Sequence, residues 1–559
     1  MKTTYLYIPV LCLVLFASCR KKFLDKAPSV NLPEEQVFTD PMLASQYADN
    51  AYNFLVNDYA RMNDHRGITG QAADEAVSGN NDVSIRTLSQ GAYHDHYERG
   101  GESINDIRDI YTRCYSGIRI ANVMLAKMGN VSWSSNQSPT RIEGEMHFLR
   151  AFLYFELIKR FGGVVLTEDA YSANDAIDFP RNTYEECVNF ILKDLDKADT
   201  QLPEDYDNSN YGRATLGASK ALRSRLLLFA ASTLNNESGE SAKWQRAADA
   251  AKAVMDMNKY SLQATYADLL NVPTSSEYIM IKVRAPRASS SGIFLDFAMS
   301  PGSGGSQGSL DPTQNHVDLY EMKTTGRPIT DPLSGYDATK PYTNRDPRFN
   351  ANILFNDATW QSRKMEMWNG GKDYVANNII YTATGYYCRK MWPEAYIRNS
   401  SGTALLNYIF FRYAEILLNY AEAQNEATGP GNDILNALNL IRVRAGMPQL
   451  QTADATGAGY VENTKEAFRA RIRNERAVEL AFEDFRWYDI MRWKAGLAIV
   501  AQPMYGMETT KNTNGTFTYK KVLLPQTFQK VYLDYMHRYP IPRSEVYKSK
   551  GILLQNPVW

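Results

Sequence analysis

Two glutamates on a predicted apolar helix face constrain the fold of this chain more than any other feature of its sequence. Steps of four, three, four and three residues from Phe468 reach Ile472, Glu475, Glu479 and Phe482. Residues at this spacing share one face of an α-helix, so two carboxylates lie within an otherwise apolar stripe. Burying a carboxylate costs several kcal/mol unless it gains a hydrogen bond or an ion pair. The pattern therefore predicts basic partners on another element.

Arg442 and Arg444, in the segment LNLIRVRAGMP, are the nearest basic candidates. Glu475 and Glu479 could instead act as the general acid and base of an active site. Carboxylates one helical turn apart on a stripe that faces a core are, however, more typical of structural ion pairs. We therefore expect these charges to join helices to one another.

The composition favours some classes of partner over others. The 559 residues allow one large core or two to three domains. Lys and Arg number 61 and Asp and Glu number 62, so no overall field favours nucleic acid or an anionic membrane surface. The 36 tyrosines, against 22 phenylalanines and 8 tryptophans, favour amphipathic contact surfaces. The balance indicates a binding protein without a nucleic-acid partner.

Residues 1–18 have the pattern of a signal peptide with a lipoprotein-type cleavage site. An apolar run extends from Tyr5 to Phe16, and Ala17 and Ser18 stand directly before Cys19. This run is too short to span a bilayer, and no later segment is long enough either. We expect the mature chain to be anchored through acyl chains on Cys19. Ordinary secretion with cleavage nearby is the alternative.

The cysteines do not predict a disulfide framework. Once the signal peptide is removed and Cys19 is lipidated, Cys114, Cys187 and Cys388 remain, an odd number that leaves at least one thiol unpaired. Cys114 and Cys187 occur in helical patterns, where we expect them to pack as small hydrophobic residues.

Helical periodicity dominates the first half of the mature chain. Helices are predicted over residues 41–60, 103–128, 141–161, 184–198, 216–233 and 242–257. Asp40 and Pro41 fit the N-cap and first position of the first helix, and Thr183 with Glu186 forms a capping box before the fourth. Successive hairpins of this size with small residues at their contacts are similar to tetratricopeptide (TPR) units.

An irregular, loop-rich layer is predicted to rest on these helices. Residues 258–401 are rich in Pro, Gly, Ser and Asn and contain short strand-like runs such as YIMIKV and IFLDF. Helices return from Leu405, one of them ending at Gly446 with Pro448 beyond it. The proline-containing end should form an extended strap anchored by Trp559. The predicted fold is mainly α, with TPR-like hairpins packed against an irregular layer with short strands.

Residues 61–101 lack periodicity, and such long loops are disproportionately functional. Within them His94, His96 and Glu98 alternate as metal ligands sometimes do, but no further Cys or His cluster completes a site, so we favour a solvated strand or loop. Residues 304–308 match the nucleophile-elbow pattern formally. Because no βαβ alternation surrounds them, a flexible loop is the better interpretation.

Several segments together resemble one family, the SusD/RagB outer-membrane nutrient-binding lipoproteins of the Bacteroidetes. They are Cys19 with FLD shortly after it, EGEMHFLRAFLYFELIKRFGGVVL, DPTQNHVDLYEM, NRDPRF, FRYAEILLNYAEAQNEA, LIRVRAGMP, RIRNERAVELAFEDFRWYDIMRW, and YPIPRSEV with LLQNPVW at the end. They occur in this order and cover essentially the whole mature chain.

The resemblance implies a SusD-like fold and a lipid-anchored protein of the outer membrane, facing the cell exterior. It implies capture of a nutrient, usually a glycan, and its delivery to a SusC-like TonB-dependent transporter, without catalysis or a cofactor. The expected organisation is a signal peptide (residues 1–18), an anchor and tether (19–40), an N-terminal SusD-like helical region (41–257) and a C-terminal RagB/SusD region (258–559), the last two packed as one unit.

A sugar ring needs a flat aromatic side chain to stack on and polar groups nearby. Both occur where the 61–101 loop would meet the irregular layer, which is where we expect the ligand. The candidate residues are Asp74, Tyr93, Tyr97, Tyr336, Trp360, Trp368, Tyr386, Tyr387 and Trp392. The alternative for the tryptophans is that they pin loops to the helical core.

Two other functions remain open. A surface glycosidase would use carboxylates such as Asp74 and Glu75, although such enzymes need two carboxyl groups that flank one cleft. A TPR-like adaptor would bind peptides rather than sugars.

Overall fold

The computed structural model describes the chain in several stretches. They are residues 34–56, 68–79, 83–92, 94–95, 107–171, 179–283, 287–288, 308, 310–374, 382–390, 392, 394–395 and 403–559. Within these stretches, no helix is both long and apolar enough to cross a membrane. The proposed signal peptide, Cys19 and most of the tether lie outside them.

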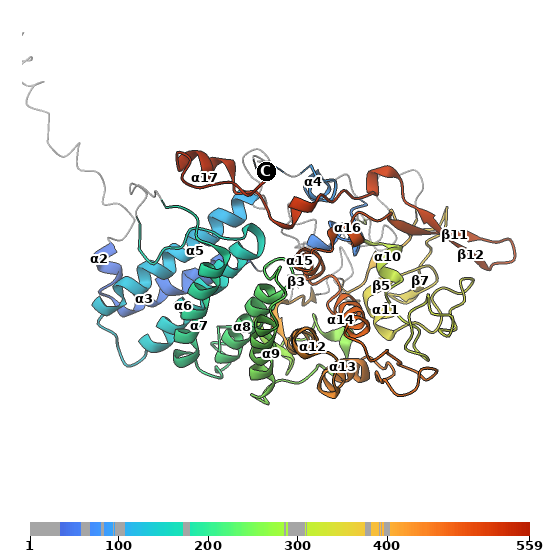
Figure 1. Cartoon of the computed structure of the whole chain (residues 1–559), viewed down its shortest axis with the longest axis horizontal. Helices are drawn as coiled ribbons and strands as arrows, with labels where there is room; N and C mark the ends of the chain where they lie inside the picture. Colours follow the sequence, from blue (N-terminus) through green and yellow to red (C-terminus); the bar gives the residue numbers. More distant parts are fainter. Residues whose placement is uncertain are drawn as a thin grey trace, which may run out of the picture.

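Successive helices form one half of the molecule. They are α2 (Glu34–Val37), α3 (Pro41–Asn50), α5 (Ile107–Lys127), α6 (Pro139–Phe161), α7 (Tyr184–Gln201), α8 (Leu216–Ala231) and α9 (Ser241–Met255). From α5 to α9 each helix packs against the next one in the chain, and Figure 1 shows them side by side. Helix α12 (Tyr413–Thr428) packs on α8 and α9 and extends this array. The predicted mainly α architecture is confirmed.

Two predicted helix N-caps are confirmed, whereas one predicted helix end is wrong. The Asp40 carboxylate accepts two backbone hydrogen bonds in the first turn of α3. Thr183 and Glu186 exchange hydrogen bonds as a capping box at the start of α7. Helix α3 ends at Asn50 instead of residue 60, because a tighter 3-10 turn, Ala51–Phe54, follows it.

The C-terminal half supplies further helices. They are α13 (Asn432–Arg444), α14 (Lys465–Glu479), α15 (Arg486–Arg492), α16 (Gly496–Ile499) and α17 (Arg543–Lys548). Gly446 ends α13 as predicted, with φ of +73°, and the Met447 N–H donates to the Arg442 carbonyl at 2.9 Å. The C-terminal strap is anchored as predicted: the Trp559 indole N–H donates to the Arg538 carbonyl at 2.8 Å.

One segment predicted as helix is a strand. Helix α12 begins at Tyr413 instead of near Leu405, and β10 (Tyr408–Arg412) precedes it, pairing antiparallel with β2 (Tyr278–Lys282). Both faces of β10 are buried, since Ile409 and Phe410 are covered in different apolar clusters. A short run buried on both sides lacks the alternation that distinguishes a strand from a buried helix.

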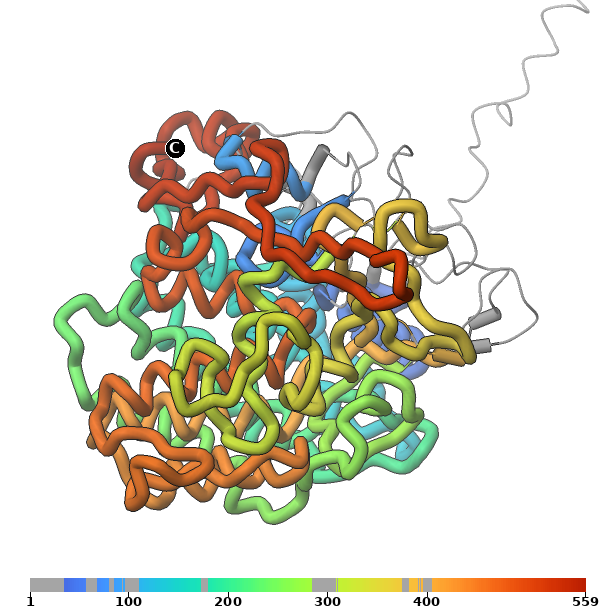
Figure 2. The backbone as a smooth tube through the Cα atoms, turned by 90° about the vertical axis from the view of Figure 1, so that its right-hand side faces the viewer, coloured from blue at the N-terminus to red at the C-terminus, as the bar shows by residue number. Residues whose placement is uncertain are grey.

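The loop-rich layer contains short strand pairs, small helices and one longer hairpin. The pairs are β1 (Ala76–Val77) with β4 (Asp311–Pro312), β3 (Arg287–Ala288) with β9 (Thr403–Ala404), β5 (Ile353–Leu354) with β8 (Tyr387–Cys388), β6 (Thr359–Trp360) with β7 (Arg363–Lys364), and β11 (Tyr505–Lys511) with β12 (Phe517–Leu523). The small helices are α4 (Val83–Ser89), α10 (Gln314–Val317) and α11 (Pro347–Asn352). Figure 2 shows the β11–β12 hairpin at the face that carries this layer. The segment IFLDF lies outside the described residues.

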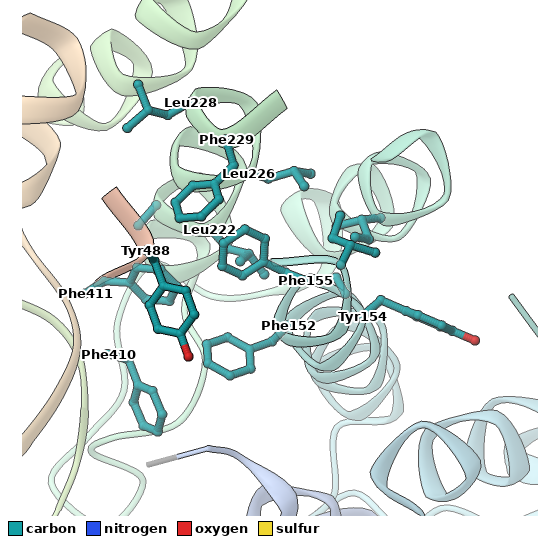
Figure 3. Packing of buried hydrophobic residues seen from close by; sticks show 14 of the residues in the cluster. Phe152, Tyr154, Phe155, Leu222, Leu226, Leu228, Phe229, Phe410, Phe411 and Tyr488 are labelled. Atoms are coloured by element: carbon teal, nitrogen blue, oxygen red, sulfur yellow. The ribbon is translucent and has the colours of Figure 1, made fainter. Parts of the chain in front are cut away.

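A single large apolar cluster contains side chains from both halves of the chain. Figure 3 shows Phe152 and Phe155 of α6 beside α8 and β10. The Phe152 ring meets the Phe410 ring edge-on at 5.6 Å, and Phe155 meets Phe229 at 5.4 Å. Cys114, Cys187 and Cys388 are buried, and these three described cysteines form no disulfide with one another.

The predicted ion pairs of α14 are present. Arg442 binds Glu475 at 3.0 Å, and Arg444 binds Glu479 at 2.5 Å. Arg348, from α11, contacts both glutamates at 2.6 and 3.1 Å, and Arg412, from β10, contacts Glu479 at 2.7 Å. In Figure 1, α13 lies below α14 and α11 lies to its right. The two carboxylates therefore join α14 to three other elements.

These contacts keep Glu479 charged. Burial by itself would raise its pKa, but the guanidinium groups of Arg444, Arg412 and Arg348 outweigh burial and hold the pKa far below its usual range. The predicted stripe is interrupted after this residue. Helix α14 ends at Glu479, and Phe482 lies beyond it with φ of +62° in the turn that leads to α15.

Candidate functional site

Most of the aromatic residues expected to bind ligand are inside the molecule. Trp360, Trp392, Tyr386 and Tyr387 are all at most 3% exposed. The two indole rings pack edge to face at 5.1 Å, and the Tyr386 hydroxyl donates to the Gln314 side chain at 2.6 Å. In this structure these rings offer no free face to a sugar. Their burial fits the alternative that they pin loops to the core.

The remaining aromatic candidates differ in their placement. Tyr93 and Tyr97 lie outside the described residues. Tyr336 is half-buried, with the Arg345 guanidinium 5.6 Å from its ring centre. Trp368 is also half-buried and lies against the β11–β12 hairpin, 5.3 Å from the Phe517 ring and 4.4 Å from Lys511 Nζ. Among the described aromatic candidates, Trp368 and Tyr336 are therefore the two that are not fully buried.

Asp74 and Glu75 do not flank a cleft. Arg486 binds both oxygens of Asp74 at 2.8 Å, and Glu75 accepts a hydrogen bond from the Phe482 N–H at 2.7 Å. Both carboxyl groups are buried, and burial raises the pKa of Glu75 to about 8. They join the 68–79 segment to the turn between α14 and α15. This arrangement gives no support to the two-carboxylate mechanism of a glycosidase.

A groove of about 500 Å³ opens where the 61–101 segment meets the irregular layer. Gly79 and Arg86 come from that segment, and Tyr374 and residues 382–385 come from the layer. The base of the β11–β12 hairpin and residues 522–528 complete its lining. This volume is within the range of about 300–1,000 Å³ that is usual for ligand pockets. We call it the α4 groove. It lies beside the 61–101 segment, where the binding surface was expected, but none of its lining residues is among the predicted ligand-binding residues.

One wall of the α4 groove joins α4 to residues 525–531. The Val531 N–H donates to the Ser89 carbonyl at 2.9 Å, and the Gln90 amide donates to the Thr527 carbonyl at 3.2 Å. The Arg86 guanidinium lies 5.1 Å from the centre of the Phe528 ring. Figure 1 shows α4 among the C-terminal segments. Residues more than 400 positions apart thus build one wall.

A tight turn at residues 382–385 forms part of the opposite wall. The Thr382 hydroxyl oxygen accepts hydrogen bonds from the N–H groups of Thr384 and Gly385, at 3.1 and 3.0 Å. The Met507 N–H donates to the Thr384 carbonyl at 2.7 Å and so ties β11 to the turn. A Cβ at Gly385 would lie 2.2 Å from the Met507 carbonyl oxygen, so this approach requires glycine.

The groove combines apolar and polar groups in the way that a sugar requires. Phe528 and Tyr374 supply half-buried aromatic rings, Arg86 and Glu508 supply charged groups, and Thr527 supplies an exposed hydroxyl group. Among the described residues, no cluster of three or more His, Cys, Asp or Glu side chains could hold a metal ion. His96 and Glu98 lie outside the described residues. The chemistry of the groove is that of binding by stacking and hydrogen bonding.

The sequence-based prediction did not include Phe528 or the β11–β12 hairpin. A usable signal was present, because Asn514-Gly515 lies between two strand-like runs and is typical of a hairpin turn. Phe528 itself carries no local signal.

A second cavity, of about 70 Å³, lies between the helical array and the turn after α14. Glu156, Lys159, Asp484 and Tyr488 are among the side chains that line it. Burial raises the pKa of Asp484 to about 6 and lowers that of Lys159 to about 8. Its volume suits a few water molecules and is too small for an oligosaccharide.

Comparisons with known proteins agree with this fold. The model of the SusD family matches residues 275–559, and a model described as "Starch-binding associating with outer membrane" matches residues 22–228. SusD-like protein P2 of Formosa agariphila is 24% identical over 470 residues, which cover 82% of this chain and 81% of that protein. A SusD-like protein of Bacteroides ovatus is 24% identical over 511 residues, covering 88% and 83%.

Solved structures extend the similarity to nearly the whole chain. A SusD-like protein from Bacteroides fragilis has a TM-score of 0.75 and 27% identity, covering 96% of this chain and all of that one. A second protein from that organism, described as a SusD-like carbohydrate binding protein, has a TM-score of 0.74 and 22% identity, covering 93% and 99%. With the family model matching the C-terminal half and this fold matching nearly all of the chain, the protein belongs to the SusD family.

Proposed function

We propose that this protein binds a glycan or oligosaccharide at the cell surface without cleaving it and delivers it to a SusC-like TonB-dependent transporter. The protein would be held in the outer membrane by acyl chains on Cys19. The observation that carries the binding role is the α4 groove, whose volume and mixture of aromatic and polar groups suit a sugar. The name of the matching N-terminal family model, which refers to starch binding and to the outer membrane, supports the same role.

Within the groove, Phe528 is the proposed stacking ring, and Arg86, Glu508 and Thr527 are the proposed hydrogen-bonding groups. Trp368, which packs against the β11–β12 hairpin, would extend the surface for a longer chain. Tyr336 remains a candidate further away. The buried Trp360 and Trp392 would not contact the ligand.

A glycan and peptide array tests the class of ligand. The protein, produced from residue 20 onward without a lipid, should retain sugars and not peptides. Retained glycans should then raise its melting temperature, because a ligand that binds only the folded state stabilises it. Peptides that raise the melting temperature when no sugar does would indicate the adaptor function instead.

Incubation with each retained polysaccharide tests the absence of catalysis. We expect no reducing ends above those in a blank without protein. Product release that persists after a second purification step would contradict the binding-only proposal and indicate a glycosidase.

A further inference from the structure

Lys530 is buried with its ammonium group directed at backbone carbonyls. Lys530 is 7% exposed. Its Nζ donates to the carbonyl oxygens of Gln71 at 2.8 Å, Ala76 at 2.5 Å and Ala73. No carboxylate of the described residues lies within ion-pairing distance of Nζ, in contrast to Lys390, which binds Glu483 at 2.6 Å. Lys530 is therefore a cation held by neutral oxygens.

The three acceptors match the ammonium form of the side chain. An ammonium group has three N–H bonds to donate, whereas a neutral amine has two. All three carbonyls belong to residues 71–76, so this short segment turns around a single nitrogen atom. Ala76 and Pro312 form a non-hydrogen-bonded pair of the β1–β4 ladder, since the Thr313 N–H donates to the Glu75 carbonyl, so the Ala76 carbonyl points away from β4 and accepts from Lys530.

The electrostatics of the site are consistent with this geometry. Burial lowers the pKa of Lys530 to about 7, while the nearby charges of Asp74 and Glu75 act in the opposite direction. Carbonyl dipoles directed at a buried ammonium favour its charged form. Oxygen cages of this kind are also what bound alkali-metal ions require.

We propose that Lys530 is a positioning residue, an internal cation that fixes residues 71–76 through a cage of three carbonyls, as a bound ion would, and thereby holds one wall of the α4 groove. Gly79, which lines the groove, follows the caged segment by three residues, and Lys530 follows Phe528 of the same wall by two residues. The effect on ligand binding rests on the proposed function, but the cage does not.

Chemical rescue distinguishes the ammonium from the carbon stem that carries it. Lys530→Ala removes three carbons and the ammonium, which together correspond to propylammonium. We expect this variant to refold in lower yield and to melt at a lower temperature than the wild type. Propylammonium chloride should restore both in a dose-dependent manner, whereas n-propanol with the same concentration of sodium chloride should not.

A second variant and a matched control complete the test. Lys530→Met keeps an unbranched apolar side chain, so it should remain defective and gain nothing from propylammonium. Lys521→Ala removes a lysine that binds Asp318 at 2.7 Å and is 47% exposed, and it should refold normally under all conditions. Hydrogen exchange of the refolded Lys530→Met protein should be faster in residues 68–79 and 83–92 than in the wild type.

Two results would overturn the proposal. One is a Lys530→Met protein with the refolding yield and melting temperature of the wild type, which would show that only the stem matters. The other is equal rescue of Lys530→Ala by n-propanol and propylammonium, or rescue by neither. These outcomes are independent of glycan binding, because no ligand is present. A failure to bind any glycan would leave the cage intact and contradict only the proposed function.

Discussion

Glu479→Gln removes the negative charge that Arg348, Arg412 and Arg444 all contact. The side chain keeps its size, but the carboxylate that accepts from Arg444 at 2.5 Å, Arg412 at 2.7 Å and Arg348 at 3.1 Å becomes a neutral amide. Its NH₂ group would also point a donor at guanidinium groups that are themselves only donors. Removing one partner of a buried ion pair typically costs about 3–5 kcal/mol.

The remaining contacts reduce this loss. Arg348 keeps Asp346 and Glu475, while Arg412 and Arg444 both keep Glu277. Every cation therefore retains a carboxylate, which places the expected loss at the lower end, about 3 kcal/mol in the free energy of unfolding. Guanidinium chloride unfolding followed by tryptophan fluorescence measures it.

Glu466→Gln is the matched control, because it makes the same substitution on the same helix. Glu466 is 77% exposed and lies 3.7 Å from Arg469, so its loss should change stability little. If Glu479→Gln is no more destabilising than Glu466→Gln, the carboxylates of α14 do not hold the surrounding elements together. The ion-pair interpretation of the sequence would then be wrong as an account of stability.

Three further predictions concern other parts of the chain. Burial raises the pKa of Glu75 to about 8, against 4.5 in the unfolded chain, so its contribution to stability is present below pH 4.5 and is lost as the pH rises through 8. In thermal melts, Glu75→Gln should therefore gain stability relative to the wild type as the pH rises from 4.5 to 8. A difference that does not depend on pH would contradict the assignment. Gly385→Ala should destabilise the protein more than Gly370→Ala. Both glycines have positive φ, but only a Cβ at Gly385 would meet another atom, the Met507 carbonyl oxygen at 2.2 Å. Equal melting temperatures of the two variants would refute the close approach. Cys19→Ala should move the protein from the membrane to the soluble fraction without changing its melting temperature. If the variant stays in the membrane fraction after a salt wash, in a strain that lacks the transporter, that result would count against the lipid anchor.

The sequence predicted the contacts of α14 because helical spacing alone determines which residues share a face. Glu475 and Glu479 had to be buried together, and Arg442 and Arg444 were the nearest charges on another helix. Arg348 could not be anticipated, since it lies on a short helix within the irregular layer and only tertiary folding brings it to α14. Periodicity therefore located the network but not all of its members.

The same limit explains the outcome for the binding surface. The location that we predicted for it rested on the absence of periodicity in residues 61–101 and 258–401. In such segments no pattern tells which side chains face inward, so Trp360 and Tyr386 could not be separated from Trp368 by their neighbours in sequence. Phe528 lines the groove only because residues 525–531 pack on α4, a contact between the two ends of the chain.

The affinity of the Phe528→Ala protein for a glycan retained on the array tests the central claim most directly. Isothermal titration should show binding weakened by about 1–3 kcal/mol, as expected when a central aromatic contact is removed. Tyr547→Ala removes an aromatic side chain that is 71% exposed on α17 and should bind like the wild type. Equal affinity of the wild type and both folded variants would contradict the assignment of the α4 groove as the glycan-binding site.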